Sequence, residues 1–149
     1  MKRLIISGSP RARGRSAGVA EAVRFAFEES CADDDVQLVS LADVRISPCT
    51  GCETCADTLG RNELYCIISD DMLRVREMLN ACDQLTVVSP VYFAGAPSQL
   101  KAFLDRLQPY FYANWRAKPK RPASLYVVGE GIEKKQENFA EEIASMVKG

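Results

Sequence analysis

A short segment between Ser7 and Ser16 combines glycine, serine and proline with three arginines, directly after an apolar run at residues 4–6. Helix-forming sequence follows, so the segment leaves backbone N–H groups free where a helix begins and where its dipole favours an anion. Serine hydroxyls add donors, and arginine matches phosphate oxygens with paired hydrogen bonds. These residue types in this order predict a phosphate-binding loop rather than an ordinary strand-to-helix turn.

The loop matches neither of two common phosphate-binding patterns. Ser16 follows an arginine, whereas a P-loop has lysine at that place. Gly8, Gly14 and Gly18 lack the spacing of the dinucleotide fingerprint GxGxxG. The lysine and metal-binding acid of nucleotide hydrolases are also missing. Flavodoxin-like folds place the phosphate of flavin mononucleotide (FMN) on a serine- and threonine-rich loop after the first strand, and this is the best remaining candidate.

Four of the six cysteines lie in one connection between residues 45 and 68. Thiolates two residues apart converge in a tight turn, and four thiolates suit an iron–sulfur cluster or a zinc ion. A thiol-rich loop without metal, with cysteines packed or joined in a disulfide, is the open alternative. Cys31 and Cys82 stand apart and are expected to be small core residues. The candidate metal ligands are Cys49, Cys52, Cys55 and Cys66.

Composition narrows the possible functions. The 149 residues predict a single domain, 1–149, and a net charge of −1 argues against a nucleic-acid-binding surface. The absence of histidine excludes Ser–His and Cys–His nucleophile pairs and histidine-containing zinc sites. No apolar run is long enough to span a bilayer, and no secretory apolar region follows the start. We therefore expect no membrane contact and a cytoplasmic location.

Apolar periodicity predicts alternating strands and helices, as in an α/β protein with a doubly wound parallel sheet and helices on both faces. We expect Ser69–Asp71 to cap the second helix and Ser98 to cap the third. The expected strands are at about 3–7, 36–41, 84–89 and 124–128. The expected helices are at about 16–30, 71–80, 98–108 and 135–148.

Two further loops follow strands and are expected at the same sheet edge as the phosphate-binding loop. In open α/β sheets, ligands bind outside the carboxyl ends of the strands. Tyr92 and Phe93 follow the third strand and offer flat apolar surface to a ring; each aromatic alone favours a core position, but the neighbouring phosphate-binding loop favours ligand contact. Gly129, Glu130 and Gly131 follow the fourth strand. The three loops together predict a site for a ring-bearing nucleotide.

Four motifs in this order resemble the NADPH-dependent FMN reductase superfamily, and within it the iron–sulfur flavoproteins. They cover most of the chain from Met1 to about Gly131. The motifs are Gly8-Ser9-Pro10-Arg11 with Ser16; the four clustered cysteines; Ser69-Asp70-Asp71-Met72; and Ser89-Pro90-Val91-Tyr92-Phe93 leading to Lys101-Ala102-Phe103-Leu104-Asp105-Arg106.

The resemblance implies a flavodoxin-like fold with non-covalently bound FMN. The first loop would hold the FMN phosphate, and the implied cofactor-binding residues there are Ser9, Pro10, Arg11, Arg15 and Ser16. The residues implied to line the ring are Pro90, Val91, Tyr92 and Phe93, with Gly129 and Glu130 near its other side. In the iron–sulfur branch the four cysteines would carry a [4Fe–4S] cluster.

Three features depart from the family pattern. Arg15 stands where the family often has asparagine, and the gap between Cys55 and Cys66 is longer than in the compact motif of the iron–sulfur branch. Four strands are expected where a flavodoxin-like sheet has five, so the C-terminal strand is missing from the pattern. An uncovered edge strand favours self-association. We therefore expect a homodimer or homotetramer, as is usual in the family.

The sequence thus predicts an FMN-dependent NAD(P)H oxidoreductase or flavin electron carrier. NAD(P)H would be the co-substrate, and a small molecule or a protein would accept the electrons. Because the cofactor supplies the chemistry, no catalytic side chain is expected. The alternative is a non-enzymatic zinc-binding or redox-sensing module on a degenerate flavodoxin-like fold, in which the cysteines are the functional groups.

Overall fold

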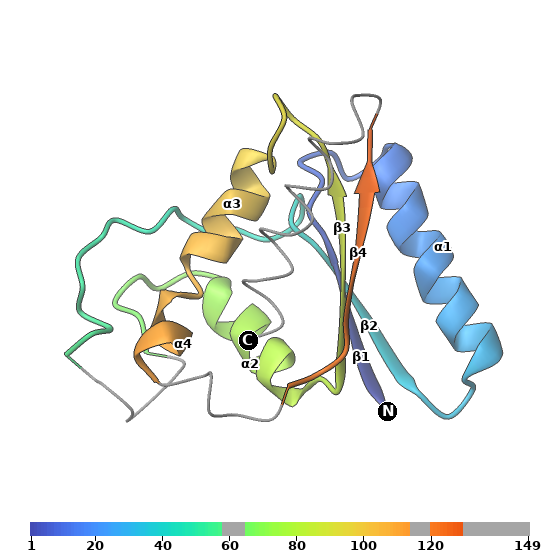
Figure 1. The fold of residues 1–149 in the computed structure, drawn as a ribbon, viewed down its shortest axis with the longest axis horizontal. Helices are drawn as coiled ribbons and strands as arrows, with labels where there is room; N and C mark the ends of the chain where they lie inside the picture. Colours follow the sequence, from blue (N-terminus) through green and yellow to red (C-terminus); the bar gives the residue numbers. More distant parts are fainter. Residues whose placement is uncertain (58–64, 114–119, 130–149) are drawn as a thin grey trace.

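The computed structural model describes residues 1–57, 65–113 and 120–129. Its strands form one parallel sheet in the order β2-β1-β3-β4 (Figure 1). The strands are β1 (Lys2–Ser7), β2 (Asp35–Ser40), β3 (Gln84–Pro90) and β4 (Ala123–Val128). The helices are α1 (Arg15–Ser30), α2 (Met72–Ala81), α3 (Ser98–Asp105) and α4 (Gln108–Tyr112).

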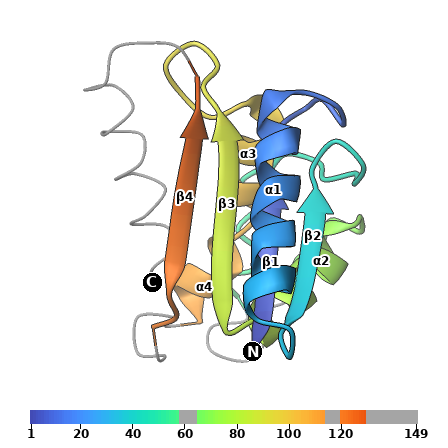
Figure 2. The ribbon, with the colours of Figure 1, turned by 90° about the vertical axis from the view of Figure 1, so that its right-hand side faces the viewer.

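Helices cover both faces of the sheet. Helix α1 lies on one face, in front of the strands in Figure 2, and α2 and α3 lie on the other face (Figures 1 and 2). This arrangement confirms the predicted flavodoxin-like α/β fold. Among the described residues, no helix has the length and apolar character needed to cross a membrane.

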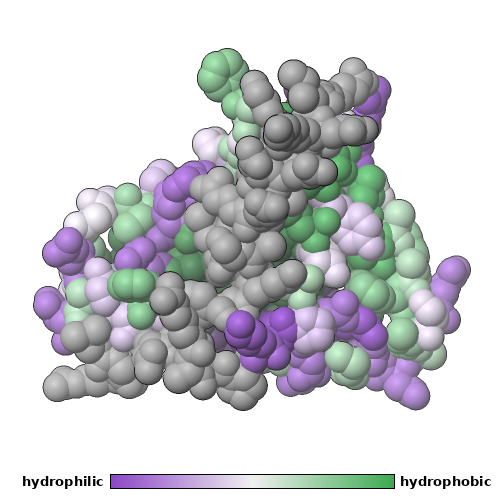
Figure 3. Space-filling view, viewed as in Figure 1, coloured by the Kyte–Doolittle hydropathy of each residue, from purple (hydrophilic) through white to green (hydrophobic). Residues whose placement is uncertain are grey.

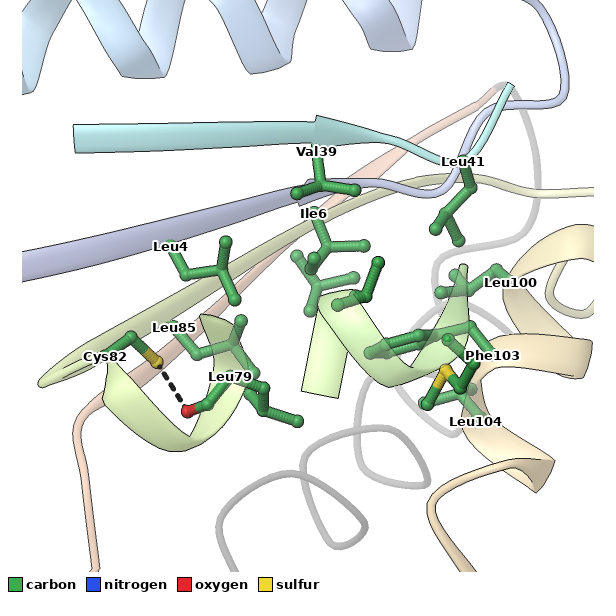
Figure 4. Close-up of a cluster of buried hydrophobic side chains, with 13 residues drawn as sticks. Leu4, Ile6, Val39, Leu41, Leu79, Cys82, Leu85, Leu100, Phe103 and Leu104 are labelled. Atoms are coloured by element: carbon green, nitrogen blue, oxygen red, sulfur yellow. Dashed lines mark hydrogen bonds between the residues drawn. The ribbon is translucent and has the colours of Figure 1, made fainter. Parts of the chain in front are cut away.

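The hydrophobic core has two parts because side chains alternate across each strand. Leu4 and Ile6 of β1 point to the side of α2 and α3, where they lie in one buried cluster with Leu79 and Phe103 (Figure 4). Ile5, between them, lies in the smaller cluster under α1. Apolar side chains on both faces of β1 are what a strand buried between two helical layers requires.

The direction of winding changes between β1 and β3, which are neighbours in the sheet. They pair from Arg3 opposite Gln84 to Ser7 opposite Val88. The loops that follow β1, β3 and β4 therefore leave the sheet at one edge, the upper edge in Figure 1. This edge is the switch point at which open α/β sheets bind ligands.

The prediction of one continuous helix at 98–108 is wrong. Helix α3 ends at Asp105 and α4 begins at Gln108. Pro109 lacks an N–H and is tolerated only in the first turn of a helix, so it starts a new helix rather than continuing the old one. The predicted Ser98 cap is also wrong, because Pro97 is the N-cap residue and the Ser98 hydroxyl donates to Gln99. The helix expected at 135–148 lies outside the described residues.

Candidate functional site

The loop after β1 is tied to its surroundings at its first residues. Gly8 donates its N–H to the Val88 carbonyl over 2.8 Å, and the Ser7 carbonyl accepts from Leu41 N–H over 2.9 Å. A Cβ on Gly8 would lie 2.8 Å from Cδ2 of Leu100, closer than real contacts allow. Glycine therefore lets this loop approach α3 closely.

The rest of this loop has buried hydroxyl groups and exposed cations. The Ser9 hydroxyl accepts from the Arg11 N–H and donates to the Arg11 carbonyl, both over 3.1 Å, which forms a tight turn. Ser9 and Ser16 are buried, whereas Arg11 and Arg15 are exposed. Gly14 precedes α1 and no side chain caps the helix. The N–H groups of its first turn thus fit an anionic group such as phosphate.

The loop after β3 displays its aromatic residues. Tyr92 and Gly95 exchange two backbone hydrogen bonds of 2.9 and 3.0 Å. At the tip, Phe93 and Ala94 have φ angles of 47° and 61°, a left-handed conformation that is uncommon outside glycine. Phe93 is fully exposed and Tyr92 is 41% exposed. The alternative that both aromatics are core residues is therefore wrong, and Figure 3 shows apolar surface at this edge of the molecule.

The loop after β4 begins beside the loop after β3. Val91 donates to the Val128 carbonyl over 3.2 Å, and a Cβ on Gly129 would lie 3.3 Å from Cβ of Val91. Pro90 is buried at the end of β3. The fold therefore brings the predicted residues of all three loops to one edge of the sheet, except Glu130, which lies outside the described residues.

The four clustered cysteines share one neighbourhood. Cys55 lies close enough to Cys49, Cys52 and Cys66 to interact with them electrostatically, and among the described residues none of the four forms a disulfide. Gly51, between the first two cysteines, has a φ of 68°, a left-handed conformation that glycine adopts readily. Within the part of the chain that the structure describes, no three cysteine, aspartate or glutamate side chains have the arrangement of a metal site. The thiols therefore lie near one another, but they do not have the arrangement of metal ligands.

Local contacts give the thiols different acidities. A hydrogen bond from Thr54 lowers the pKa of the exposed Cys52 thiol, whereas burial raises the pKa of Cys55. Cys82 is buried as predicted, and its thiol donates to the Leu79 carbonyl over 3.2 Å (Figure 4). Cys31 is only partly buried, so the expectation of a core position is wrong for that residue.

Comparison with known proteins identifies the family. The model of the NADPH-dependent FMN reductase family matches residues 1–139. The chain belongs to this family. It is 37% identical to an iron–sulfur flavoprotein of Methanocaldococcus jannaschii over 110 residues, which are 73% of the chain and 53% of that protein. An iron–sulfur flavoprotein of Methanosarcina thermophila is 34% identical over 131 residues, which are 87% of the chain and 64% of that protein.

The fold agrees with this membership of the FMN reductase family. An NAD(P)H:quinone oxidoreductase from Methanothermobacter marburgensis superposes with a TM-score of 0.68 and 19% identity, over 97% of this chain and 76% of that one. At this identity the likeness shows the fold alone. The chain spans between about half and two thirds of the length of the two flavoprotein relatives.

The burial of two arginines in this member of the FMN reductase family was not predicted from the sequence. Arg76 of α2 and Arg106, just after α3, are 1% and 2% exposed. The Arg106 guanidinium forms paired bonds of 2.7 and 3.1 Å with the Asp70 carboxylate. It also donates to the carbonyls of Ser47 (2.8 Å) and Ile68 (3.1 Å). In the sequence, only the family motif that ends at Arg106 drew attention to this residue. The spacing of nearby residues does not indicate a partner for an arginine side chain.

We define residues 48–67 as the cysteine segment. Asp70 and Asp71 also help to join its two ends. Asp70 accepts from the N–H groups of Ser47 (2.8 Å) and Met72 (3.0 Å), the first residue of α2, whereas the N-cap residue, Asp71, makes no side-chain cap hydrogen bond. Asp71 accepts instead from Arg45 N–H over 2.7 Å. The residues on both sides of the cysteine segment are therefore joined at its base.

The Asp70 contacts predict acid sensitivity. Burial raises the pKa of Asp70, but hydrogen bonds from Arg106, Ser47 and Met72 outweigh it, so the pKa lies below its ordinary value of 3.8. The stabilisation is therefore fully present above the unfolded-state pKa and is lost as the pH falls through the folded-state pKa. Urea unfolding at about pH 5 and about pH 3 measures the loss. Asp70→Asn is expected to lose less stability over this interval, and equal losses would exclude Asp70 as the titrating group.

Proposed function

We propose that the chain is an FMN-dependent oxidoreductase or a flavin electron carrier. The observation that carries the proposal is the meeting of three loops at the switch point of the sheet. One loop ends in an uncapped helix start with buried serines, and another presents Tyr92 and Phe93 to solvent. Membership of the NADPH-dependent FMN reductase family supports FMN as the ligand of this edge.

The residues at this edge fit the two ends of FMN. Backbone N–H groups at the start of α1, hydroxyls and arginines suit a phosphate, and the proposed residues are Ser9, Pro10, Arg11, Arg15 and Ser16. The residues proposed to border the isoalloxazine ring are Pro90, Val91, Tyr92, Phe93, Gly129 and Glu130. The flavin supplies hydride and electron transfer when bound, and the protein orients it. NAD(P)H is the proposed reductant.

We further propose that the cysteine segment holds a [4Fe–4S] cluster. Cys55 lies in electrostatic range of the other three cysteines, and two relatives carry the name iron–sulfur flavoprotein. The four cysteines, none of them in a disulfide, equally support the second candidate, a zinc-binding or redox-sensing module, because both kinds of site use thiolates. The proposed ligands are Cys49, Cys52, Cys55 and Cys66.

Absorption spectra of protein purified without oxygen test these proposals. We expect two resolved flavin bands that bleach on adding dithionite, with a broad brown absorption beneath them from the cluster. Metal analysis then separates iron from zinc. Colourless protein that takes up no added FMN would overturn the flavin proposal, and zinc without flavin would favour the second candidate. Self-association and a cytoplasmic location stay predictions from the sequence.

A further inference from the structure

The two edge strands of the sheet differ in how they are protected. Among the residues that the structure describes, β2 pairs only with β1, and β4 pairs only with β3. β2 carries the exposed Asp35 and Gln37, whose side chains form a hydrogen bond of 3.1 Å with each other. β4 contains neither a charged residue nor a proline. Charges and prolines commonly protect an edge strand against pairing with another chain, so β2 has a protection that β4 lacks.

One face of β4 is also uncovered by the described elements. Leu125 and Val127 pack against the core on the side of α2 and α3. Ser124 and Tyr126 alternate with them and point to the side of α1, where both are exposed, Tyr126 by 45%. Helix α1 packs on β1, β2 and β3, and no described helix lies in front of β4 in Figure 2. The unprotected edge therefore lies next to a large exposed aromatic side chain.

The chemistry of this edge indicates the kind of partner that fits it. An edge strand presents a row of backbone N–H and C=O groups, which another extended strand can pair along its whole length. The partner strand must be apolar on the core face and must accommodate Tyr126 on the other face. Directly opposed residues of antiparallel strands share a face. With Leu125 on a twofold axis, a second β4 would place Leu125 opposite its own copy and Tyr126 opposite Ser124, so β4 is complementary to itself.

We propose that β4 is the interface of a twofold dimer, in which the β4 strands of two copies of this chain pair antiparallel and join the two sheets. Each Tyr126 then covers Ser124 of the second copy, and Leu125 and Val127 of both copies join the two cores. Such an interface uses the same patch on both copies, as twofold dimers do. The carboxyl ends of the two sheets point in opposite directions, so the two candidate sites stay separate. The proposal does not depend on the flavin or on the cysteine segment.

The first test compares the unchanged protein with Tyr126→Lys and with Gln37→Lys, the matched control on the other edge strand. Sedimentation equilibrium measures the dimer dissociation constant, and circular dichroism reports folding. We expect Tyr126→Lys to raise this constant at least about 30-fold, as for a central aromatic anchor, and Gln37→Lys to leave it unchanged. Ser124→Lys replaces Tyr126→Lys if that variant does not fold. A monomeric unchanged protein, or equal effects on both edges, would overturn the proposal.

Photo-crosslinking tests where the two copies meet. The photoreactive amino acid p-benzoylphenylalanine replaces Tyr126 in one sample and Gln37 in the control, and mass spectrometry identifies the joined peptides. We expect a covalent dimer from position 126, joined to β4 of the second copy, and none from position 37. A dimer that gives no crosslink from position 126 has its interface elsewhere. A crosslink from 126 within a single chain means that the chain covers this face itself. Either result would overturn the proposal.

Discussion

Arg106→Met is expected to lower the free energy of unfolding by about 3–5 kcal/mol, the cost of breaking a buried ion pair by removing one partner. The side chains of Arg106 and Asp70 are 1% and 5% exposed, so the remaining carboxylate would be a buried charge without its counterion. The carbonyls of Ser47 and Ile68 would lose a donor as well. Chemical denaturation measures the change.

Two further variants separate the loss of the ion pair from the loss of packing. Lys101→Met removes an exposed ion pair with Asp105, where the lysine is 54% exposed, and is expected to change stability by less than about 1 kcal/mol. The double variant Asp70→Asn/Arg106→Met is expected to regain part of the loss because no unpaired charge stays buried. If Arg106→Met costs no more than Lys101→Met, the pair does not hold the segment in solution.

Arg11→Ala combined with Ser16→Ala is expected to weaken FMN binding about 10²- to 10⁴-fold. Hydrogen bonds to a charged group contribute about 1.5–3 kcal/mol each, and two of them would be lost. Arg11 is exposed, so its removal should leave the fold intact, and Ser16 is a small buried residue in the first turn of α1. Titration of FMN fluorescence with apoprotein measures the dissociation constant.

The same loop offers a matched control for this measurement. Arg13 is exposed and lies between Arg11 and Arg15, but it is not among the proposed phosphate ligands. Arg13→Ala is expected to change the affinity only slightly, because a solvated charge without a direct contact is largely screened by salt. Equal losses from Arg13→Ala and Arg11→Ala would mean that the loop attracts FMN by overall charge, and unchanged flavin retention in the double variant would exclude the site.

The sheet could be predicted from the sequence because its signals are local. Apolar runs bounded by glycine, proline or aspartate gave all four strands within one residue at each end; β3, for example, was expected at 84–89 and spans Gln84–Pro90. Parallel pairing followed from the alternation of strands and helices. The loop residues at the carboxyl ends could then be assigned to one edge without any knowledge of contacts.

The base of the cysteine segment could not be predicted because its contacts join distant positions. Arg106 and Ser47 are 59 residues apart. Arg76 does fall on the buried stripe of α2 with Met72 and Leu79, but its residue type argues against burial. Charged residues in an amphipathic helix are ordinarily exposed. Burial became possible only because Asp70 and backbone carbonyls converge on Arg106 in the folded chain. The same convergence turns Arg106 inward just after α3, where the predicted helix at 98–108 is interrupted.

The parallel sheet also determines the order in which the strands can pair as the chain emerges from the ribosome. The strand β1 can pair with β2 early, but its other neighbour, β3, is synthesised about eighty residues later. Such high contact order slows folding, since long loops must close before their contacts form. All the cysteines of the segment precede β3, whereas Arg106 follows it. The thiols of the segment are therefore synthesised before the arginine that joins its two ends, so the base of the segment can form only after the central strands have paired.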